Sequence, residues 1–437
     1  MNPILFLFIG FVVLLMSGLP LAFSLGGLSV VAILLFYGNV NVMFMLVSAV
    51  NTITQSPVYV AAPLFIFMGT LLEKSGVSDK LFDSMYIIMG RLKGGLAIAT
   101  ILICTLLAAT TGVIAATIAL MTMLALPAML KYRYNRKLAT GTIMAVGCLG
   151  QLLPPSVIMI VFAGQAQLSV GRMFAGGIGA GLMFSALFIL YVVIRTIINP
   201  DVAPAASREE SDNYSTGEKV AMLLKSVAPT LFLIVMVLGS IMFGFATPTE
   251  AAAVGCMGAL LLVILNRRFS LKMIIQASFS TTLATAMIFF IITAASMFAH
   301  VFIGLRGGVI ISEFLQGLPF GPWGILIVIL LIVVIVGFFI DAYGLVMIGV
   351  PVFMPIIIGL GFDPLWFAVL FITMLVMSFM TPPFSYAAFY VKGSARMEIN
   401  MGELYGASWQ YVAIYVVGIA LLCIFPQIIT FLPSVLF

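Results

Sequence analysis

Glycine, hydroxyl and proline residues interrupt long apolar segments at four places, and these interruptions are where the chain could do chemistry. They lie at residues 109–112, 150–156, 337–344 and 378–385. Glycine permits close backbone approach, whereas proline ends a helix and frees carbonyl oxygens. Free carbonyl oxygens attract cations such as sodium, and the free amides of helix N-termini attract anions. The interruptions therefore predict sites for a small cation and an anion.

The composition indicates that these sites lie inside a membrane. Of 437 residues, 63% are hydrophobic and only 8% are charged, against roughly 25% charged in a soluble domain. Apolar runs of about 20 residues, enough to cross the hydrocarbon, recur along the chain. The start lacks a basic segment, so residues 4–16 are predicted to be a first membrane helix and not a signal peptide. The runs lack the alternation of a barrel, which predicts an α-helical membrane protein.

Other kinds of site find little support. The four cysteines stand singly in apolar stretches, which favours core packing over metal binding or disulfides. The single histidine, His300, argues against a histidine-based metal site, and packing is favoured over a proton relay. No basic and aromatic surface of the nucleic-acid-binding kind is visible.

The elements that must position the interruptions fall into two halves. In the first half, helices are expected over residues 4–17, 20–37, 57–74 and 173–198, with a re-entrant hairpin over 94–130 and a broken helix over 137–167. The hairpin arms, 94–108 and 113–130, are too short to span comfortably. In the second half, the hairpin covers 321–359 and the broken helix 364–392. The polar stretch 199–225 is the expected linker, which divides the chain into repeats 1–198 and 226–437.

An internal repeat supports this division. Four proline pairs share an offset of 228 residues: Pro20 and Pro248, Pro127 and Pro355, Pro154 and Pro382, Pro155 and Pro383. Such symmetry is typical of secondary transporters. If the halves are inverted, all 19 Lys and Arg residues except Arg172 and Arg306 fall on the cytoplasmic side. The predicted fold is therefore an all-α polytopic membrane protein of two inverted-topology repeats, with both termini outside.

Each hairpin tip is expected to meet a helix break. One composite site joins Thr110, Thr111 and Gly112 to residues 150–156, and the other joins residues 337–344 to 378–385. Substrate contacts are predicted at the polar and glycine positions Thr110, Ser156, Asp341, Gly344 and Ser385. Asp341 is a carboxylate at membrane depth, which suggests function, but a helix cap explains it equally well.

Two further polar residues have structural explanations that are favoured. Thr247-Pro248-Thr249-Glu250 is typical of a capping box with proline at the first helical position. Arg306 lies in a glycine-rich connector, where a solvated loop position is favoured over contact with an anionic substrate or a partner.

The motifs, taken in order, resemble the large membrane subunit of tripartite ATP-independent periplasmic transporters, the DctM type. The resemblance rests on Pro-Leu-Phe-Ile-Phe-Met-Gly at 63–69, Leu-Leu-Pro-Pro-Ser at 152–156, Ala-Thr-Pro-Thr-Glu-Ala at 246–251, Phe-Ile-Asp at 339–341 and Thr-Pro-Pro at 381–383. It implies an elevator-type sodium symporter in the bacterial inner membrane. It also implies two partners, a small four-helix membrane subunit (DctQ type) as a separate chain and a periplasmic substrate-binding protein (DctP type) that delivers an organic acid anion.

The resemblance also implies sodium ligands, with sodium as the coupling ion and no organic cofactor. The first site would use Thr111, Gly112, Gly150, Leu153 and Pro155, and the second Gly337, Ser378, Thr381 and Pro383. Where many relatives have Ser-Gly-Ser at the first tip, this chain has Thr111-Gly112-Val113, so a side-chain ligand from position 113 is lost.

The leading hypothesis is sodium-coupled uptake of a small organic anion. A stand-alone sodium/anion symporter that needs no binding protein is the alternative. An intramembrane enzyme is disfavoured, because no zinc-binding His/Glu pair, aspartate pair or Ser/His pair lies within the apolar segments.

Overall fold

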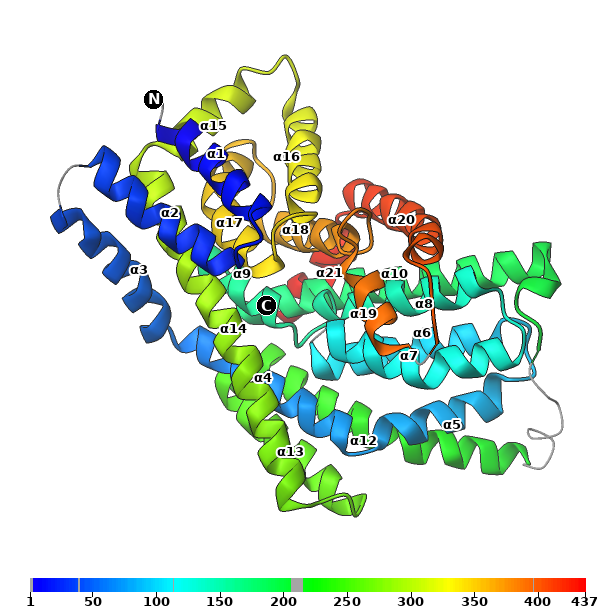
Figure 1. Cartoon of the computed structure of the whole chain (residues 1–437). Coiled ribbons are helices and arrows are strands. Elements are labelled where there is room, and N and C mark those ends of the chain that lie inside the picture. Colours follow the sequence, from blue (N-terminus) through cyan, green and yellow to red (C-terminus); the bar gives the residue numbers. More distant parts are fainter. Residues whose placement is uncertain (1–2, 38–39, 113, 206–214, 396) are drawn as a thin grey trace.

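The computed structural model describes residues 3–37, 40–112, 114–205, 215–395 and 397–437 (Figure 1). Every regular element in these ranges is helical. Eight helices are long and apolar enough to cross a membrane by length and composition. Many side chains on the outer surface are apolar, for example Phe245 (84% exposed) and Leu265 (67%), as expected for a surface that faces lipid. The prediction of an α-helical, multi-pass membrane protein is confirmed.

The first half contains ten α-helices within the described residues. They are α1 (Pro3–Met16), α2 (Leu21–Phe36), α3 (Phe44–Gln55), α4 (Pro57–Lys74), α5 (Val77–Met89), α6 (Gly95–Thr111), α7 (Ile114–Lys131), α8 (Arg136–Cys148), α9 (Val157–Ala166) and α10 (Val170–Ile198). Short 3-10 turns, η1 (Val40–Met43) and η2 (Leu149–Gln151), precede α3 and follow α8.

The second half follows a third 3-10 turn, η3 (Pro200–Val202). Its helices are α12 (Thr216–Met242), α13 (Pro248–Leu265), α14 (Leu271–Gly304), α15 (Gly307–Gln316), α16 (Pro322–Gly337), α17 (Ala342–Gly359), α18 (Pro364–Ser378), α19 (Tyr386–Ser394), α20 (Met401–Ile424) and α21 (Gln427–Leu436).

The helix order repeats at the offset that the prolines indicated. The first residues of α7 and α17 are 228 positions apart, and so are those of α8 and α18. One difference separates the halves: α3 and α4 are two helices joined at Ser56, whereas the corresponding α14 is one helix of 34 residues. Ser56 is extended and Pro57 follows it at the first position of α4, where proline needs no helical hydrogen bond.

Two groups of helices are visible in Figure 1. In the first group α4 packs on α13 and α14, α14 on α2 and α3, and α12 on α5. In the second group the hairpins and broken helices pack together, and the packing is reciprocal. Helix α7 of the first hairpin contacts α19 of the second broken helix, and α17 of the second hairpin contacts α9 of the first. This exchange ties the two halves of the chain together around the helix breaks.

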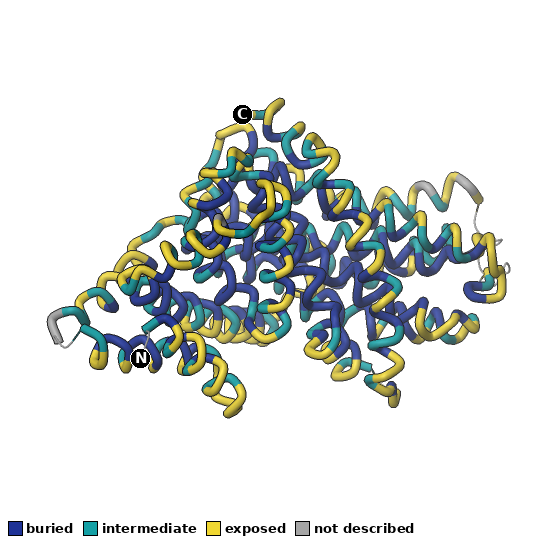
Figure 2. Tube along the Cα trace, turned by 90° about the horizontal axis from the view of Figure 1, so that it is seen from above, coloured by how far each residue is buried: buried dark blue, intermediate teal, exposed yellow. Residues whose placement is uncertain are grey.

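The buried residues concentrate where these helices meet, along the middle of the molecule (Figure 2). Between α10 and α20, Phe188 lies against the rings of Tyr411 and Tyr415. Both tyrosines are fully buried, so each hydroxyl needs a partner. The Tyr411 hydroxyl forms a hydrogen bond of 2.6 Å with that of Thr142, and the Tyr415 hydroxyl donates to the Ala145 carbonyl at 3.0 Å. These bonds hold α8 against α20.

The helix boundaries refine several sequence predictions. Helix α12 begins at Thr216 behind a capping box of Ser215 and Glu218, so the last residues of the expected linker are helical. Residues 206–214 of that linker lie outside the described residues. The amphipathic helix α5 was not predicted, because it lacks a long apolar run. The predicted capping box of Thr247 and Glu250 at the start of α13 is confirmed.

Candidate functional site

The first hairpin tip meets the first helix break at Gly112. Its backbone has φ +61°, in the left-handed region that favours glycine. A Cβ atom on Gly112 would lie 2.6 Å from the carbonyl oxygen of Pro155. The tip and the break therefore touch through main-chain atoms, an approach that only glycine permits.

The first break leaves several carbonyl oxygens free. After η2, Leu152 and Leu153 both donate their amides to the Leu149 carbonyl, at 2.9 and 2.8 Å. Among the hydrogen bonds of the described residues, none ends on the carbonyl oxygens of Leu153 to Pro155. The fully buried Ser156 hydroxyl donates to the Gln151 carbonyl at 2.6 Å, which leaves its own lone pairs unused. The break thus offers oxygen atoms and little else to a ligand.

The first break also has a close neighbour on the side of α10. A Cβ on Gly177 would lie 2.6 Å from the Leu152 carbonyl oxygen, and one on Gly181 would lie 2.4 Å from the Leu153 side chain. These two glycines, one helical turn apart, let α10 lie directly against the non-helical backbone. The contact shields the break from lipid, as backbone polar groups at membrane depth require.

The second tip and break approach each other in the same way. Helix α16 ends at Gly337, and a Cβ there would lie 2.6 Å from the Ser378 hydroxyl oxygen and 3.1 Å from the Ser378 Cβ. Ser378 is the last residue of α18, immediately before the break. Both predicted composite sites are therefore spatial neighbours across a single glycine contact each.

Hydroxyl groups surround the second break. Ser378 donates to the Leu375 carbonyl at 2.7 Å, and Thr381 donates to the Met377 carbonyl at 2.8 Å. Ser385 caps α19 by accepting from the Ala388 amide at 3.4 Å. Ser378 and Ser385 are 1% and 0% exposed. Because the hydroxyl protons of Ser378 and Thr381 point back into the helix, the oxygen lone pairs remain for a cation.

Asp341 stands at the second tip as the N-cap of α17. Its carboxylate accepts a hydrogen bond of 3.0 Å from the Tyr343 amide, so the capping role foreseen for it is present. Gly344 lies elsewhere: a Cβ there would meet Leu21 of α2 at 3.1 Å and Ile291 of α14 at 3.8 Å. The structure brings Asp341 to the tip and places Gly344 against the other helix group.

The remaining predicted residues are placed less fully. Gly150 is buried within η2. The backbone of Thr110 and Thr111 ends α6, but their side chains lie outside what the structure describes, as does the whole of Val113. Pro383, in the second break, accepts a hydrogen bond of 2.9 Å from the Tyr405 hydroxyl of α20. Sequence reasoning missed Tyr405, because a lone tyrosine 22 residues further along the chain gives no local signal.

Comparison with known proteins identifies the family. Residues 8–428 match the model of the DctM component of tripartite ATP-independent periplasmic transporters. The chain belongs to the DctM family. The resemblance seen in its motifs is confirmed, and the family and the relatives named next are transporter components, which confirms the prediction that the protein is not an enzyme.

Relatives of this DctM chain extend over almost its whole length. The C4-dicarboxylate TRAP transporter large permease protein DctM of Vibrio cholerae is 29% identical and covers 98% of this chain and 97% of its own. The ectoine TRAP transporter large permease protein TeaC of Halomonas elongata is 28% identical and covers 97% of each chain. The crystal structure of the YdaH transporter of Alcanivorax borkumensis matches with a TM-score of 0.63 at 17% identity, and 97% of each chain is covered. The last match supports the fold of the DctM chain.

Proposed function

We propose that the chain is the large membrane subunit of a sodium-coupled transporter that imports a small organic anion. A periplasmic binding protein of the DctP type would deliver the anion, and a separate small four-helix subunit of the DctQ type would complete the membrane complex. The complex would lie in the bacterial inner membrane, with both termini of this chain on the periplasmic side. The substrate would be a carboxylate or a similar organic acid, because both relatives carry organic solutes in their names.

The observation that carries the proposal is the double contact between tips and breaks. Gly112 lies against Pro155, and Gly337 lies against Ser378. Each contact brings a hairpin tip next to a broken helix, and unwound carbonyls at such places coordinate sodium in secondary transporters. The oxygen-rich surroundings suit a hard cation. The free amides at the starts of α9 and α19 suit the anion.

Ligands are assigned to the two sites from this geometry. The first sodium would be held by Thr111, Gly112, Gly150, Leu153 and Pro155, and the second by Gly337, Ser378, Thr381 and Pro383. The anion would contact Thr110, Ser156, Asp341 and Ser385, with Gly344 acting from the opposite side of the tip. Pro383 would share its carbonyl oxygen between sodium and Tyr405, since a carbonyl has two lone pairs.

The two groups of helices supply the moving parts of the proposal. The hairpins and broken helices exchange contacts between halves, so they would move as one body that carries both sites. The long helices α4, α12, α13 and α14 would hold still against the membrane. This is an elevator mechanism, in which a rigid unit carries the sites from one side to the other.

Uptake into proteoliposomes tests the proposal. The chain is reconstituted with the two partner proteins encoded beside it, and labelled candidate acids are offered outside under an inward sodium gradient. We expect uptake that requires the binding protein and collapses when sodium is replaced by choline. Uptake by this chain alone would favour the stand-alone symporter, and uptake indifferent to sodium would reject the coupling ion.

A further inference from the structure

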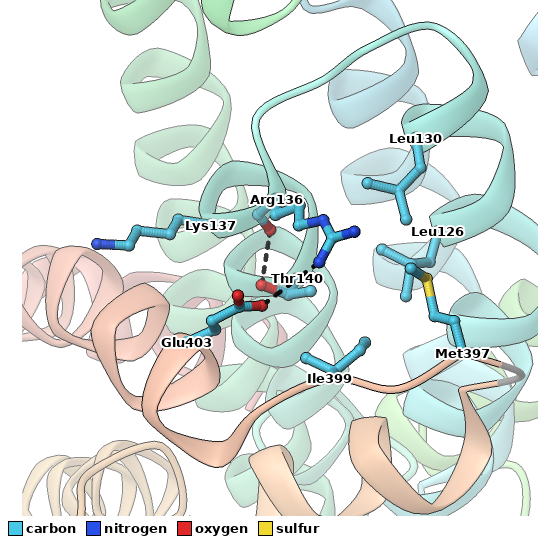
Figure 3. Close-up of a pocket in the computed structure, with 8 residues that line it drawn as sticks. All are labelled: Leu126, Leu130, Arg136, Lys137, Thr140, Met397, Ile399 and Glu403. Atoms are coloured by element: carbon cyan, nitrogen blue, oxygen red, sulfur yellow. Dashed lines mark hydrogen bonds and ion pairs between the residues drawn. The ribbon is translucent and has the colours of Figure 1, made fainter.

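A hollow opens where two corners of the chain meet, away from the helix breaks. It lies between the α7–α8 corner and the segment that joins α19 to α20, and its volume is about 650 Å³ (Figure 3). Volumes of this size accommodate small organic molecules. A narrower recess at its floor is lined by Leu126 and Leu130 of α7 and by Thr140 of α8.

The hollow is one half-helix away from each candidate site. Helix α8 has Arg136 at its first residue, beside the hollow, and ends at the first break 13 residues later. Helix α19 begins at the second break and has Lys392 in its last turn, again beside the hollow. At 1.5 Å per residue these distances are about 20 Å and about 14 Å. Under the inverted arrangement proposed above, this end of both helices faces the cytoplasm.

Basic and acidic side chains share the rim. Arg136 and Glu403 form an ion pair with 3.8 Å between Nη1 and Oε2, and the two side chains are 57% and 47% exposed. Lys392 and Glu398 also line the hollow, and no ion pair of either is found among the described residues. An exposed pair of this kind contributes little, typically below about 1 kcal/mol. An incoming carboxylate could therefore displace Glu403 from Arg136 at small cost.

The floor of the hollow is apolar. Leu126, Leu130, Met397 and Ile399 line it together, and Met397 is 38% exposed. A basic rim over an apolar floor matches a small organic acid, whose charged group and carbon skeleton need different surroundings. Inorganic anions would gain nothing from the floor.

We propose that this hollow is the position that the transported organic anion occupies on the cytoplasmic side before release. Arg136 and Lys392 hold its anionic group, and Glu403 and Glu398 compete with that group for them. The competition keeps binding weak, as release requires, because a site on a transport path must let its ligand leave. The inference rests on the proposed function.

Protection of an introduced thiol from labelling tests the inference. Met397→Cys is prepared in the full chain, placed in nanodiscs of phosphatidylcholine, and treated with uncharged N-ethylmaleimide; the parent chain gives the background. Sodium succinate is the probe, succinamide is its uncharged counterpart, and sodium chloride matches the ionic strength. A ligand at twice its dissociation constant slows labelling about threefold. We expect this slowing with succinate and none with succinamide.

Charge variants in the same background provide opposite signs. Lys392→Gln is expected to remove protection, and Glu403→Gln to strengthen it at least about threefold, because the competitor is gone. Lys272→Gln, an exposed lysine on distant α14, is the matched control and is expected to leave protection unchanged. Equal protection by succinamide, or equal protection in all variants, would overturn the inference.

Two further measurements separate this inference from the proposed function. Nanodiscs that contain phosphatidylglycerol report on lipid: protection by the lipid alone would assign the hollow to a headgroup phosphate and overturn the inference. Sodium-driven uptake without thiol protection would reject the hollow and keep the transporter. Protection without sodium-driven uptake would reject the release role.

Discussion

Replacement of Gly112 by alanine tests the first sodium site most sharply. The new Cβ would lie 2.6 Å from the Pro155 carbonyl oxygen, about 0.8 Å short of the 3.4 Å at which ordinary contact begins. The obstacle is backbone, so it cannot rotate away, and the tip must withdraw. Binding sites tolerate displacements of only about 0.5 Å. The substitution is therefore expected to pull the tip out of register with the break.

The expected loss follows from one weakened oxygen ligand. A contact to a charged partner is worth about 1.5–3 kcal/mol, which corresponds to a rise of about tenfold to a hundredfold in half-saturating sodium. The assay is the sodium dependence of uptake into proteoliposomes that contain the complete transporter. The thermal midpoint of each variant, measured in the same detergent, shows that the protein is folded.

Alanine at Gly112 also introduces backbone strain, which needs a matched control. Gly361 has φ +82°, and no atom lies within 4 Å of the position that a Cβ would take there. Gly361→Ala therefore introduces the same strain of about 1–2 kcal/mol without the clash. We expect Gly361→Ala to lower the thermal midpoint and to leave half-saturating sodium unchanged. If Gly112→Ala also shows half-saturating sodium within twofold of the parent, the first site is misassigned.

Three other substitutions bear on the second site. Thr381→Val keeps the shape and removes an oxygen, so half-saturating sodium should rise about tenfold, whereas Thr373→Val, which loses the same kind of bond in α18, should not change it; equal effects would remove Thr381 from the site. Asp341→Asn retains the cap, so stability should stay within about 0.5 kcal/mol while sodium-driven uptake falls; parental uptake would leave only the capping role. Tyr405→Phe removes the donor to Pro383 and should cost about 1 kcal/mol in thermal unfolding, a loss that an unchanged midpoint would contradict.

The sequence predicts the helix breaks well because their causes are local. Proline cannot continue a helix and glycine permits a positive φ, so Pro154 and Gly112 mark their positions without help from the rest of the chain. The breaks and both hairpins appear in the structure within a few residues of their predicted limits. The shared offset of 228 residues then relates one half to the other.

Tertiary contacts leave weaker traces in the sequence. The packing of α7 on α19 and of α17 on α9 depends on how the two halves interlock, which no spacing records. The donation from Tyr405 to Pro383 and the hollow beside Arg136 depend on the path of the chain after α19 for the same reason. The short amphipathic helix α5 was missed because the search for membrane spans follows long apolar runs.

Sodium binding between each tip and its break can be observed by cryo-electron microscopy of the complete transporter, imaged once in sodium and once in choline. We expect sodium-dependent density between Gly112 and Pro155, and a second density among Gly337, Ser378 and Thr381, both lost in choline. Identical maps in the two salts at these positions, or sodium density elsewhere in the chain, would contradict the assignment of both sites.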